Sequence, residues 1–170
     1  SGAEAIVILA NFASVLEKII DRTSVRTVVV TEFGDLLSFP KAFIVNAVLR
    51  YVKKMVPAYG LPGHWRFTEI LAEGRSMSFS PVALDGDNIA FLQYTGGTTG
   101  PSKGAMLTHG SVRANVEQMM AWTETYTEPG KEVIITALPL YHIFALVCNC
   151  MCFFRTGGLN VLIPNPRDVP

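Results

Sequence analysis

Charge is the property that this sequence has least of for its length. Only 16% of its 170 residues are charged, and 14 basic and 14 acidic residues leave a formal net charge of zero. Binding to a nucleic-acid backbone needs a clustered basic surplus, so the composition argues against a nucleic-acid partner. Hydrophobic residues make up 49% of the chain, which is enough to bury a core.

Cysteine is also scarce. The three cysteines, Cys148, Cys150 and Cys152, lie within one apolar stretch. Alternate positions of an α-helix lie about 200° apart around its axis, so these thiols would not converge on one metal ion. We therefore expect small buried core residues and no metal site. Without a spaced disulfide framework, a reducing, cytoplasmic compartment is the simpler expectation.

Charged residues are missing altogether from residues 133–154, a stretch long enough to cross a bilayer. Pro139 interrupts this stretch, and Tyr141, His142 and Asn149 add polar groups to it. Its first half is also rich in β-branched residues. A buried strand, a turn and a buried helix are therefore predicted here in place of a membrane span.

Hydrophobic periodicity predicts alternating strands and helices. Strands are expected at 5–9, 25–31, 88–94, 132–138 and 159–163, and helices at 12–22, 41–56, 67–73, 109–123 and 143–154. The first strand, helix and strand form a βαβ pattern, which predicts parallel pairing. The expected fold class is α/β, with a mostly parallel sheet and flanking helices. Thr108 is expected as the N-cap of the helix that His109 starts.

The most informative segment is the loop at 95–104, with the sequence Thr-Gly-Gly-Thr-Thr-Gly-Pro-Ser-Lys-Gly. Its glycines let backbone N–H groups approach an anion, and its hydroxyls and lysine add donors. In a Walker A loop the lysine follows a glycine, whereas Lys103 follows Ser102. A different kind of phosphate loop is favoured over an ordinary turn. The expected phosphate-binding residues are Thr95, Gly96, Gly97, Thr98, Thr99, Gly100, Ser102 and Lys103.

Two segments of this sequence resemble a known superfamily. Residues 93–109, Gln-Tyr-Thr-Gly-Gly-Thr-Thr-Gly-Pro-Ser-Lys-Gly-Ala-Met-Leu-Thr-His, resemble the phosphate-loop signature of the acyl-adenylate-forming enzymes. That superfamily contains acyl-CoA synthetases, firefly luciferase and nonribosomal peptide adenylation domains. Residues 137–146, Ala-Leu-Pro-Leu-Tyr-His-Ile-Phe-Ala-Leu, resemble its next motif, which lies beside the acyl substrate. Within the superfamily, the residues of both segments are most similar to those of the bacterial long-chain-fatty-acid-CoA ligases.

The resemblance implies ATP-dependent activation of a long-chain fatty acid to an acyl-adenylate and then to a thioester of coenzyme A, with Mg²⁺. It implies a catalytic role for His142, with Tyr141, His142 and Phe144 beside the acyl group. Enzymes of the family are much longer, so residues 1–170 are expected to be part of a large N-terminal domain without the C-terminal domain. The segments that supply the family's magnesium-binding Glu, ribose-binding Asp and adenylation Lys are not found, so the isolated chain should be inactive.

Two alternatives remain open beside the fatty-acid ligase. One is an aryl-CoA ligase or a luciferase-like adenylate former, and the other is a non-enzymatic module that binds nucleotide or membrane. A peptide-synthetase adenylation domain is disfavoured, because residues 137–154 contain no Asp to pair with a substrate amino group.

The segment from Lys41 to Val56 raises the possibility of membrane contact. A wide apolar face with Arg50, Lys53 and Lys54 toward one end suits peripheral attachment at the inner face of the cell membrane. The alternative is a core-packed helix with a solvated basic end. Exposed sheet edges could also support a homodimer.

Overall fold

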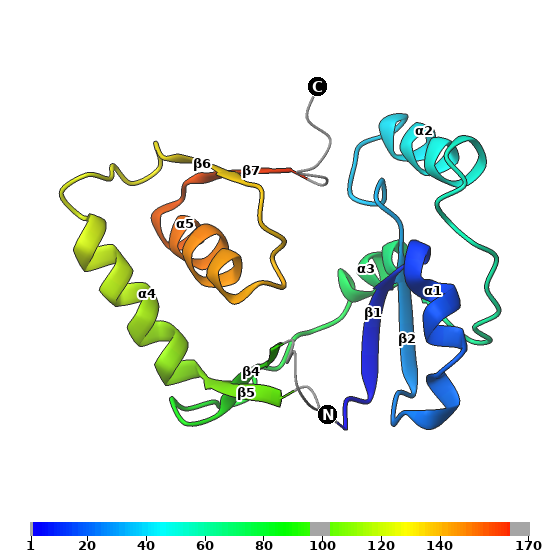
Figure 1. Ribbon diagram of the computed structural model, residues 1–170, viewed down its shortest axis with the longest axis horizontal. Coiled ribbons are helices and arrows are strands. Elements are labelled where there is room, and N and C mark those ends of the chain that lie inside the picture. The colour runs from blue at the N-terminus through cyan, green and yellow to red at the C-terminus, as the bar shows by residue number, and fades with distance from the viewer. Residues whose placement is uncertain (1, 96–102, 164–170) are drawn as a thin grey trace. The chain divides into compact units, whose positions relative to one another are not determined.

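The computed structural model describes residues 2–95 and 103–163. The chain divides into two compact units, Ser1–Pro81 and Val82–Pro170, each with its own strands and helices (Figure 1). Both units mix helices with short strands, as the sequence predicts, and each is described separately below.

Unit 1 is built on three parallel strands in the order β1-β2-β3. These strands are β1 (Ala5–Leu9), β2 (Thr27–Thr31) and β3 (Trp65–Arg66). Helix α1 (Ala10–Glu17) and the 3₁₀ turn η1 (Ile20–Arg22) connect β1 to β2, so the predicted parallel βαβ pattern is confirmed. The prediction missed β3, which has only two residues. Helix α3 (Phe67–Gly74) follows it directly.

The core of unit 1 lies between α1 and β2. The helix contributes Ala10, Ala13 and Leu16, which follow one another at three-residue steps and share one face of α1. The strand contributes Val28 and Val30, which lie two residues apart and therefore on the same face of β2. Two small alanines on the helix allow its backbone to approach the branched valines closely.

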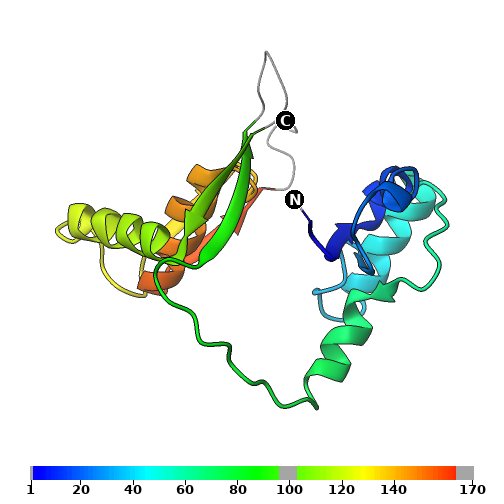
Figure 2. The same cartoon turned by 90° about the horizontal axis from the view of Figure 1, so that it is seen from below.

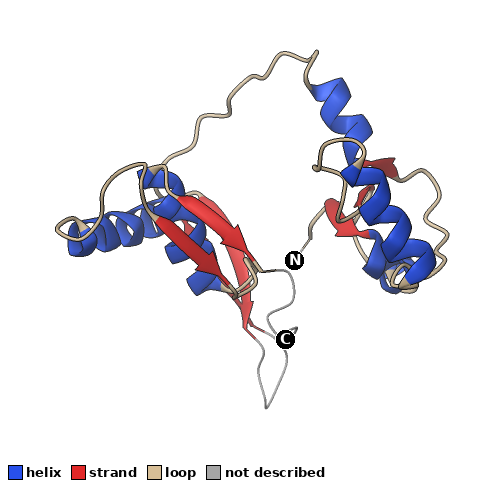
Figure 3. Ribbon diagram, turned by 90° about the horizontal axis from the view of Figure 1, so that it is seen from above, coloured by secondary structure: helices blue, strands red, loops and turns tan. Residues whose placement is uncertain are grey.

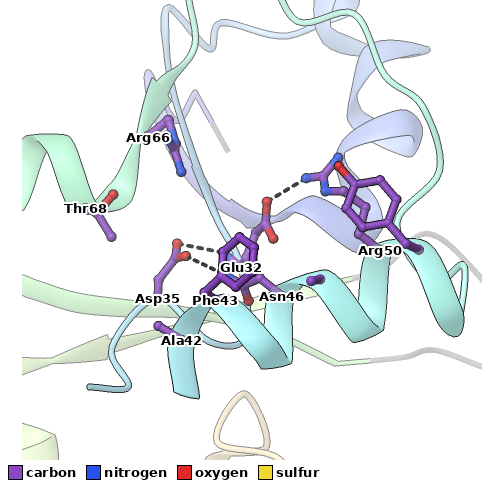
Figure 4. A pocket seen from close by; sticks show the side chains of 10 residues that line it. Glu32, Asp35, Ala42, Phe43, Asn46, Arg50, Arg66 and Thr68 are labelled. Carbon is purple, nitrogen blue, oxygen red and sulfur yellow. Dashed lines mark hydrogen bonds and ion pairs between the residues drawn. The ribbon is translucent and has the colours of Figure 1, made fainter. Parts of the chain in front are cut away.

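The loop after β2 is fixed to helix α2 (Lys41–Ala47) by a set of hydrogen bonds that we call the Asp35–Asn46 clamp. Asn46 accepts from the backbone N–H of Gly34 at 2.7 Å and donates to Asp35 at 3.0 Å (Figure 4). Asp35 also accepts from the N–H of Glu32 at 2.8 Å and from the hydroxyl of Thr31 at 3.1 Å. The clamp therefore satisfies both carboxylate oxygens of Asp35.

The π-helical segment η2 (Val48–Val52) continues α2, so the helix predicted at 41–56 ends at Val52 and changes type along its length. Arg50 of η2 forms an ion pair with Glu32 (Figure 4). The hydrogen bond to Glu32 raises the pKa of Arg50. The guanidinium group therefore belongs to the contact between η2 and the loop after β2.

Unit 2 begins with an antiparallel hairpin of β4 (Ile89–Thr95) and β5 (Lys103–Thr108), which runs into helix α4 (His109–Thr123) (Figure 2). A parallel pair, β6 (Val133–Thr136) and β7 (Leu159–Leu162), follows later in the chain. Between them lie the π-helical segment η3 (Ala145–Cys152) and α5 (Phe153–Thr156) (Figure 3). The helix predicted at 143–154 is thus present, but most of it is π-helical.

Helix α4 starts where its capping residues predict. The hydroxyl of Thr108 accepts from the N–H of Ser111 at 3.1 Å, and the hydroxyl of Ser111 accepts from the N–H of Thr108 at 3.0 Å. Two donors that the first turn leaves without helical partners are satisfied in this way. The predicted N-cap at Thr108 is confirmed.

A closed set of hydrogen bonds, the Thr136–Asn149–Asn160 network, joins β6, η3 and β7. Asn149 donates to the Thr136 hydroxyl at 3.1 Å, and that hydroxyl donates to the side-chain oxygen of Asn160 at 2.7 Å. The side-chain amide of Asn160 completes the circuit by donating to the backbone oxygen of Asn149 at 2.9 Å. Thr136 and Asn149 are buried, so these partners replace the water that both groups lose on folding.

Residues 2–95 and 103–163 can be searched for metal-binding groups and for membrane-spanning helices. Over these residues no three His, Cys, Asp or Glu side chains are grouped so that they could bind a metal ion. None of the helices in the same part of the chain combines the length and the hydropathy that a membrane span requires. The three cysteines are free thiols, with Cys152 buried and the other two half-buried.

The close approach of the loop to α2 predicts a strict size limit at Gly34. A Cβ atom there would lie 2.6 Å from the backbone oxygen of Ala42 and 2.7 Å from Asn46 Oδ1. Gly34→Ala should therefore lower the stability of unit 1 by about 1–3 kcal/mol, as overpacking does. Urea unfolding monitored by Trp65 fluorescence in a Trp122→Phe background measures this.

Gly74→Ala is the matched control for Gly34→Ala, because a Cβ at Gly74 would meet no atom within 4 Å. This variant should unfold at the original urea concentration or slightly above it, since alanine favours a helix. Equal midpoints for the two variants would contradict the described packing of Gly34 against α2.

The buried network predicts a stability loss on Asn149→Leu. This change leaves Thr136 without its donor, and an unsatisfied buried polar group costs about 1–3 kcal/mol. The measurement is the rate at which a thiol reagent labels buried Cys152 in a background with Cys148→Ala and Cys150→Ala. Labelling should become faster in Asn149→Leu and stay unchanged in Asn115→Leu, whose asparagine is exposed on α4. Unchanged labelling in both variants would mean that the network does not hold η3.

Candidate functional site

Two of the phosphate-loop candidates, Thr95 and Lys103, lie at the paired ends of β4 and β5. In the register of these strands Tyr94 pairs with Gly104, and Thr95 pairs with Lys103. The backbones of Thr95 and Lys103 are therefore placed opposite each other. The other candidates, Gly96, Gly97, Thr98, Thr99, Gly100 and Ser102, lie outside the described residues. The sequence indicated a short apolar stretch after the loop but not its antiparallel pairing with the strand before it.

Gly104 meets an aromatic ring across the hairpin. A Cβ atom at this position would lie 3.3 Å from Tyr94 Cζ, with two further ring carbons at 3.4 and 3.5 Å. The absence of a side chain therefore lets the Tyr94 ring pack over the opposite strand. Within the described residues, the last glycine of the loop motif serves this packing.

The second motif forms a tight turn ahead of η3. The N–H of His142 donates to the Pro139 oxygen at 2.9 Å, and the His142 oxygen accepts from Leu146 N–H at 3.0 Å. The N–H of Phe144 donates to Nδ1 of His142 at 3.3 Å. Because Nδ1 is an acceptor, the proton of the neutral ring is on Nε2, which is left to donate. The His142 side chain is exposed.

A direct hydrogen bond joins the two motifs. Nε2 of Gln93, on β4, donates to the backbone oxygen of Tyr141 at 2.9 Å across a sequence separation of 48 residues. The hairpin that carries the loop and the turn that carries His142 are thus neighbours within unit 2. Gln93 is the first residue of the 93–109 motif, but no role of its own was predicted for it.

Phe144 lines an apolar cavity of about 250 Å³ between α4, β6 and η3. Met119, Ile134, Cys148 and Cys152 also line it. Burial raises the pKa of the Cys152 thiol, which keeps it protonated and poorly nucleophilic. Tyr141 and His142 are not among the lining residues, so of the three acyl-site candidates only Phe144, which is itself 54% exposed, borders this cavity.

Unit 1 contains a second pocket, of about 420 Å³ and with charged groups in its wall, that the sequence did not predict (Figure 4). The carboxylates of Glu32 and Asp35 and the guanidinium groups of Arg50 and Arg66 line it. Glu32 pairs with Arg50, and Asp35 belongs to the Asp35–Asn46 clamp. These charged groups come from separate parts of the sequence, and no motif connects them.

Comparison with known proteins agrees with this combination of fold and motifs. The family model described as AMP-binding enzyme matches residues 1–170. This chain therefore belongs to the AMP-binding enzyme family.

Within this family, the chain is 52% identical over 170 residues to the long-chain-fatty-acid–CoA ligase of Escherichia coli O6:H1 (strain CFT073). That match covers 100% of the chain and 30% of the relative's length, so the chain spans less than a third of the curated relative.

Two solved structures share the fold. ATP-bound MatB from Rhodopseudomonas palustris matches with a TM-score of 0.55 and 23% identity, covering 88% of this chain and 28% of that one. The N-terminal domain of FACL13 from Mycobacterium tuberculosis, solved with an inhibitor, matches with a TM-score of 0.50 and 21% identity, covering 95% of this chain and 38% of that one. The predicted α/β fold class is thereby confirmed.

Proposed function

We propose that this chain is part of an AMP-forming ligase that activates a long-chain fatty acid with ATP and transfers it to coenzyme A. The observation that carries the proposal is the direct hydrogen bond between the phosphate-loop strand and the Tyr141–His142 turn. The 52% identity to a relative named as a long-chain-fatty-acid–CoA ligase supports the substrate class. We assign residues 1–170 to the N-terminal domain of that enzyme, with the C-terminal domain outside this chain.

In the proposed first step, a fatty-acid carboxylate oxygen attacks the α-phosphorus of ATP and pyrophosphate leaves, which gives an acyl-adenylate. In the second step the thiol of coenzyme A attacks the acyl carbonyl, and AMP leaves. The loop residues Thr95 to Lys103 would hold the β- and γ-phosphates while negative charge grows on the leaving group. Positioned donors are the main source of catalysis in such transfers.

Mg²⁺ would accompany the ATP phosphates and neutralise part of their charge. Among the described residues no three His, Cys, Asp or Glu side chains are grouped to bind a metal ion, so we assign it no ligand from this chain.

His142 is proposed to orient the reacting acyl group. Its Nδ1 accepts from Phe144 N–H, so its Nε2–H can donate to a carboxylate or acyl-phosphate oxygen. Tyr141 is exposed beside it, and Phe144, which is also exposed, borders the apolar cavity. Polar atoms at the turn and apolar atoms behind Phe144 suit a ligand with a polar head and a hydrocarbon tail.

We further propose that the segment 41–56 touches the inner face of the cell membrane while the enzyme remains peripheral. Neither α2 nor η2 contains a buried residue, and Phe43, Tyr51 and Val52 are each more than 70% exposed. Exposed Lys53 and Lys54 follow this apolar surface, which suits anionic lipid. Arg50 is excluded from this role because it pairs with Glu32.

A homodimer is a separate proposal. It would use an outer strand of unit 1, such as β1, to pair with a second copy.

The proposed function predicts ATP–pyrophosphate exchange in the presence of palmitate. The intact enzyme should catalyse it, and the isolated 170-residue chain should not. Thr98→Ala in the intact enzyme should lose about 2.7 to 4 kcal/mol of transition-state stabilisation, as when one preorganised donor is removed. Thr125→Ala, at an exposed threonine near the end of α4, is the control and should exchange at the original rate.

Exchange near the original rate in Thr98→Ala would contradict the assigned role of the loop. Activity with aromatic acids but not with palmitate would favour an aryl-CoA ligase or a luciferase-like enzyme. Nucleotide or lipid binding by the isolated chain, with no exchange by the intact protein, would favour a non-enzymatic module.

The membrane proposal predicts weaker vesicle binding when both exposed lysines are removed. Each lysine near an anionic surface contributes about 1 kcal/mol, so Lys53→Ser with Lys54→Ser should weaken binding by about 30-fold. Sedimentation with phosphatidylglycerol vesicles measures this for the intact enzyme. Lys18→Ser with Lys131→Ser makes the same charge change elsewhere and should have little effect. Equal binding by both double variants would remove Lys53 and Lys54 from the interface.

A further inference from the structure

Gln93 makes the hydrogen bond that joins the two motifs, and the reaction steps described above give its side chain no role of its own. It is half-buried on β4, where it pairs in register with Ala105 of β5, and it lies two residues before Thr95. Its side-chain amide donates at 2.9 Å to the backbone oxygen of Tyr141. The strand that leads into the phosphate loop therefore holds the turn that carries His142.

The atom that Gln93 binds determines what the contact does. The Tyr141 carbonyl and the His142 N–H belong to one planar peptide group. Gln93 donates to the oxygen of this group, and the N–H of the same group donates to Pro139 at 2.9 Å. Both ends of the peptide plane are thus fixed, and the plane sets the direction in which the His142 side chain leaves the backbone.

The ring of His142 is held by a further contact within the same turn. Its Nδ1 accepts from the Phe144 N–H at 3.3 Å, so the ring orientation follows the local backbone. A shift of β4 along the hairpin would move the Gln93 amide and, through it, the peptide between Tyr141 and His142. The position of β4 and the position of Nε2 of His142 are linked by one side chain.

We propose that Gln93 is a positioning residue that sets His142 relative to the ATP phosphates. It acts through His142 and touches no reacting atom, and the inference rests on the proposed function. Fixed relative placement of the acyl group and the nucleotide is the main requirement for an in-line attack on phosphorus, because small displacements reduce the rate strongly.

The chain offers a matched pair of variants. Gln93→Met keeps the length and most of the volume of the side chain but has no N–H to donate. Gln118→Met makes the same chemical change at an exposed glutamine on α4. Gln93→Glu is a second test at the same site, since an ionised carboxylate can only accept and would repel the Tyr141 oxygen.

In the intact enzyme, Gln93→Met should lower kcat for palmitate-dependent ATP–pyrophosphate exchange by about ten-fold, which is the upper range for one lost hydrogen bond. KM for ATP should change by less than about two-fold, because the loop donors themselves are intact. Gln93→Glu should lower kcat at least as much, and Gln118→Met should behave as the unsubstituted enzyme.

A double-mutant cycle with His142→Ala tests whether Gln93 acts through His142. Residues that act as a unit are not additive, so Gln93→Met should cost nothing further once His142 is absent. Rate losses that multiply in the double variant would overturn the proposal. An unchanged kcat in Gln93→Met would overturn it as well.

Amide hydrogen exchange of the peptide that covers residues 139–146 gives a readout that does not depend on activity. Gln93→Met should speed exchange in this peptide and leave α4 unchanged, and Gln118→Met should alter neither. Unchanged exchange at 139–146 would overturn the proposal even in an active enzyme. Faster exchange at 139–146 in a protein with no pyrophosphate exchange would refute the proposed function and leave the Gln93 contact supported.

Discussion

The part of the chain that carries both motifs depends on a small buried polar network. Thr136, Asn149 and Asn160 exchange three hydrogen bonds in a closed circuit, and each comes from a different element. Buried polar groups are costly unless satisfied, so this network penalises any alternative register of β6 on β7 or any rotation of η3. The turn at His142 leads directly into η3, and its orientation therefore rests on the same three side chains.

In unit 1 a comparable set of hydrogen bonds, the Asp35–Asn46 clamp, holds α2 against the loop after β2. Asp35 satisfies its two oxygens with three donors, one of which is the side chain of Asn46 on α2. The Glu32–Arg50 pair lies next to this clamp, and both partners are partly shielded from water. The helix is thereby attached through polar contacts at one face, which leaves Phe43 and Ile44 exposed. Such an arrangement suits a helix whose apolar residues have a partner other than the core of unit 1.

Local signals made much of this fold predictable. Strand β1 was predicted with its observed ends, and α4 begins at His109 because Thr108 and Ser111 cap it. The phosphate-loop and Tyr141–His142 motifs were recognised by their order, and the family assignment confirms the resemblance. By contrast, β3 has two residues and exists only because β2 pairs with it, so it has no periodicity of its own. The Asp35–Asn46 clamp depends on how α2 folds back onto the loop after β2, which no periodicity of the sequence reveals.

The helix type and the link at Gln93 were also beyond sequence reasoning. An apolar run predicted a helix at 143–154, but its backbone is π-helical from Ala145 to Cys152, where Asn149 makes its tertiary contact. The Gln93 contact depends on how the hairpin and the turn meet, and a glutamine in a strand carries no sign of its partner. A residue that contributes only a backbone atom, as Tyr141 does with its oxygen, cannot be identified from its side-chain type.

The ring of Tyr94 over Gly104 shows how to interpret a glycine-rich signature. Each glycine of a glycine-rich nucleotide loop is easily assumed to let the backbone approach a phosphate. Gly104 instead has the ring of Tyr94 in the space where its Cβ would be. The glycines of such a signature therefore have two different reasons: some give the ligand access to the backbone, and others leave room for packing within the scaffold. A substitution at such a glycine can weaken nucleotide binding by displacing a strand, without removing any group that faces the nucleotide.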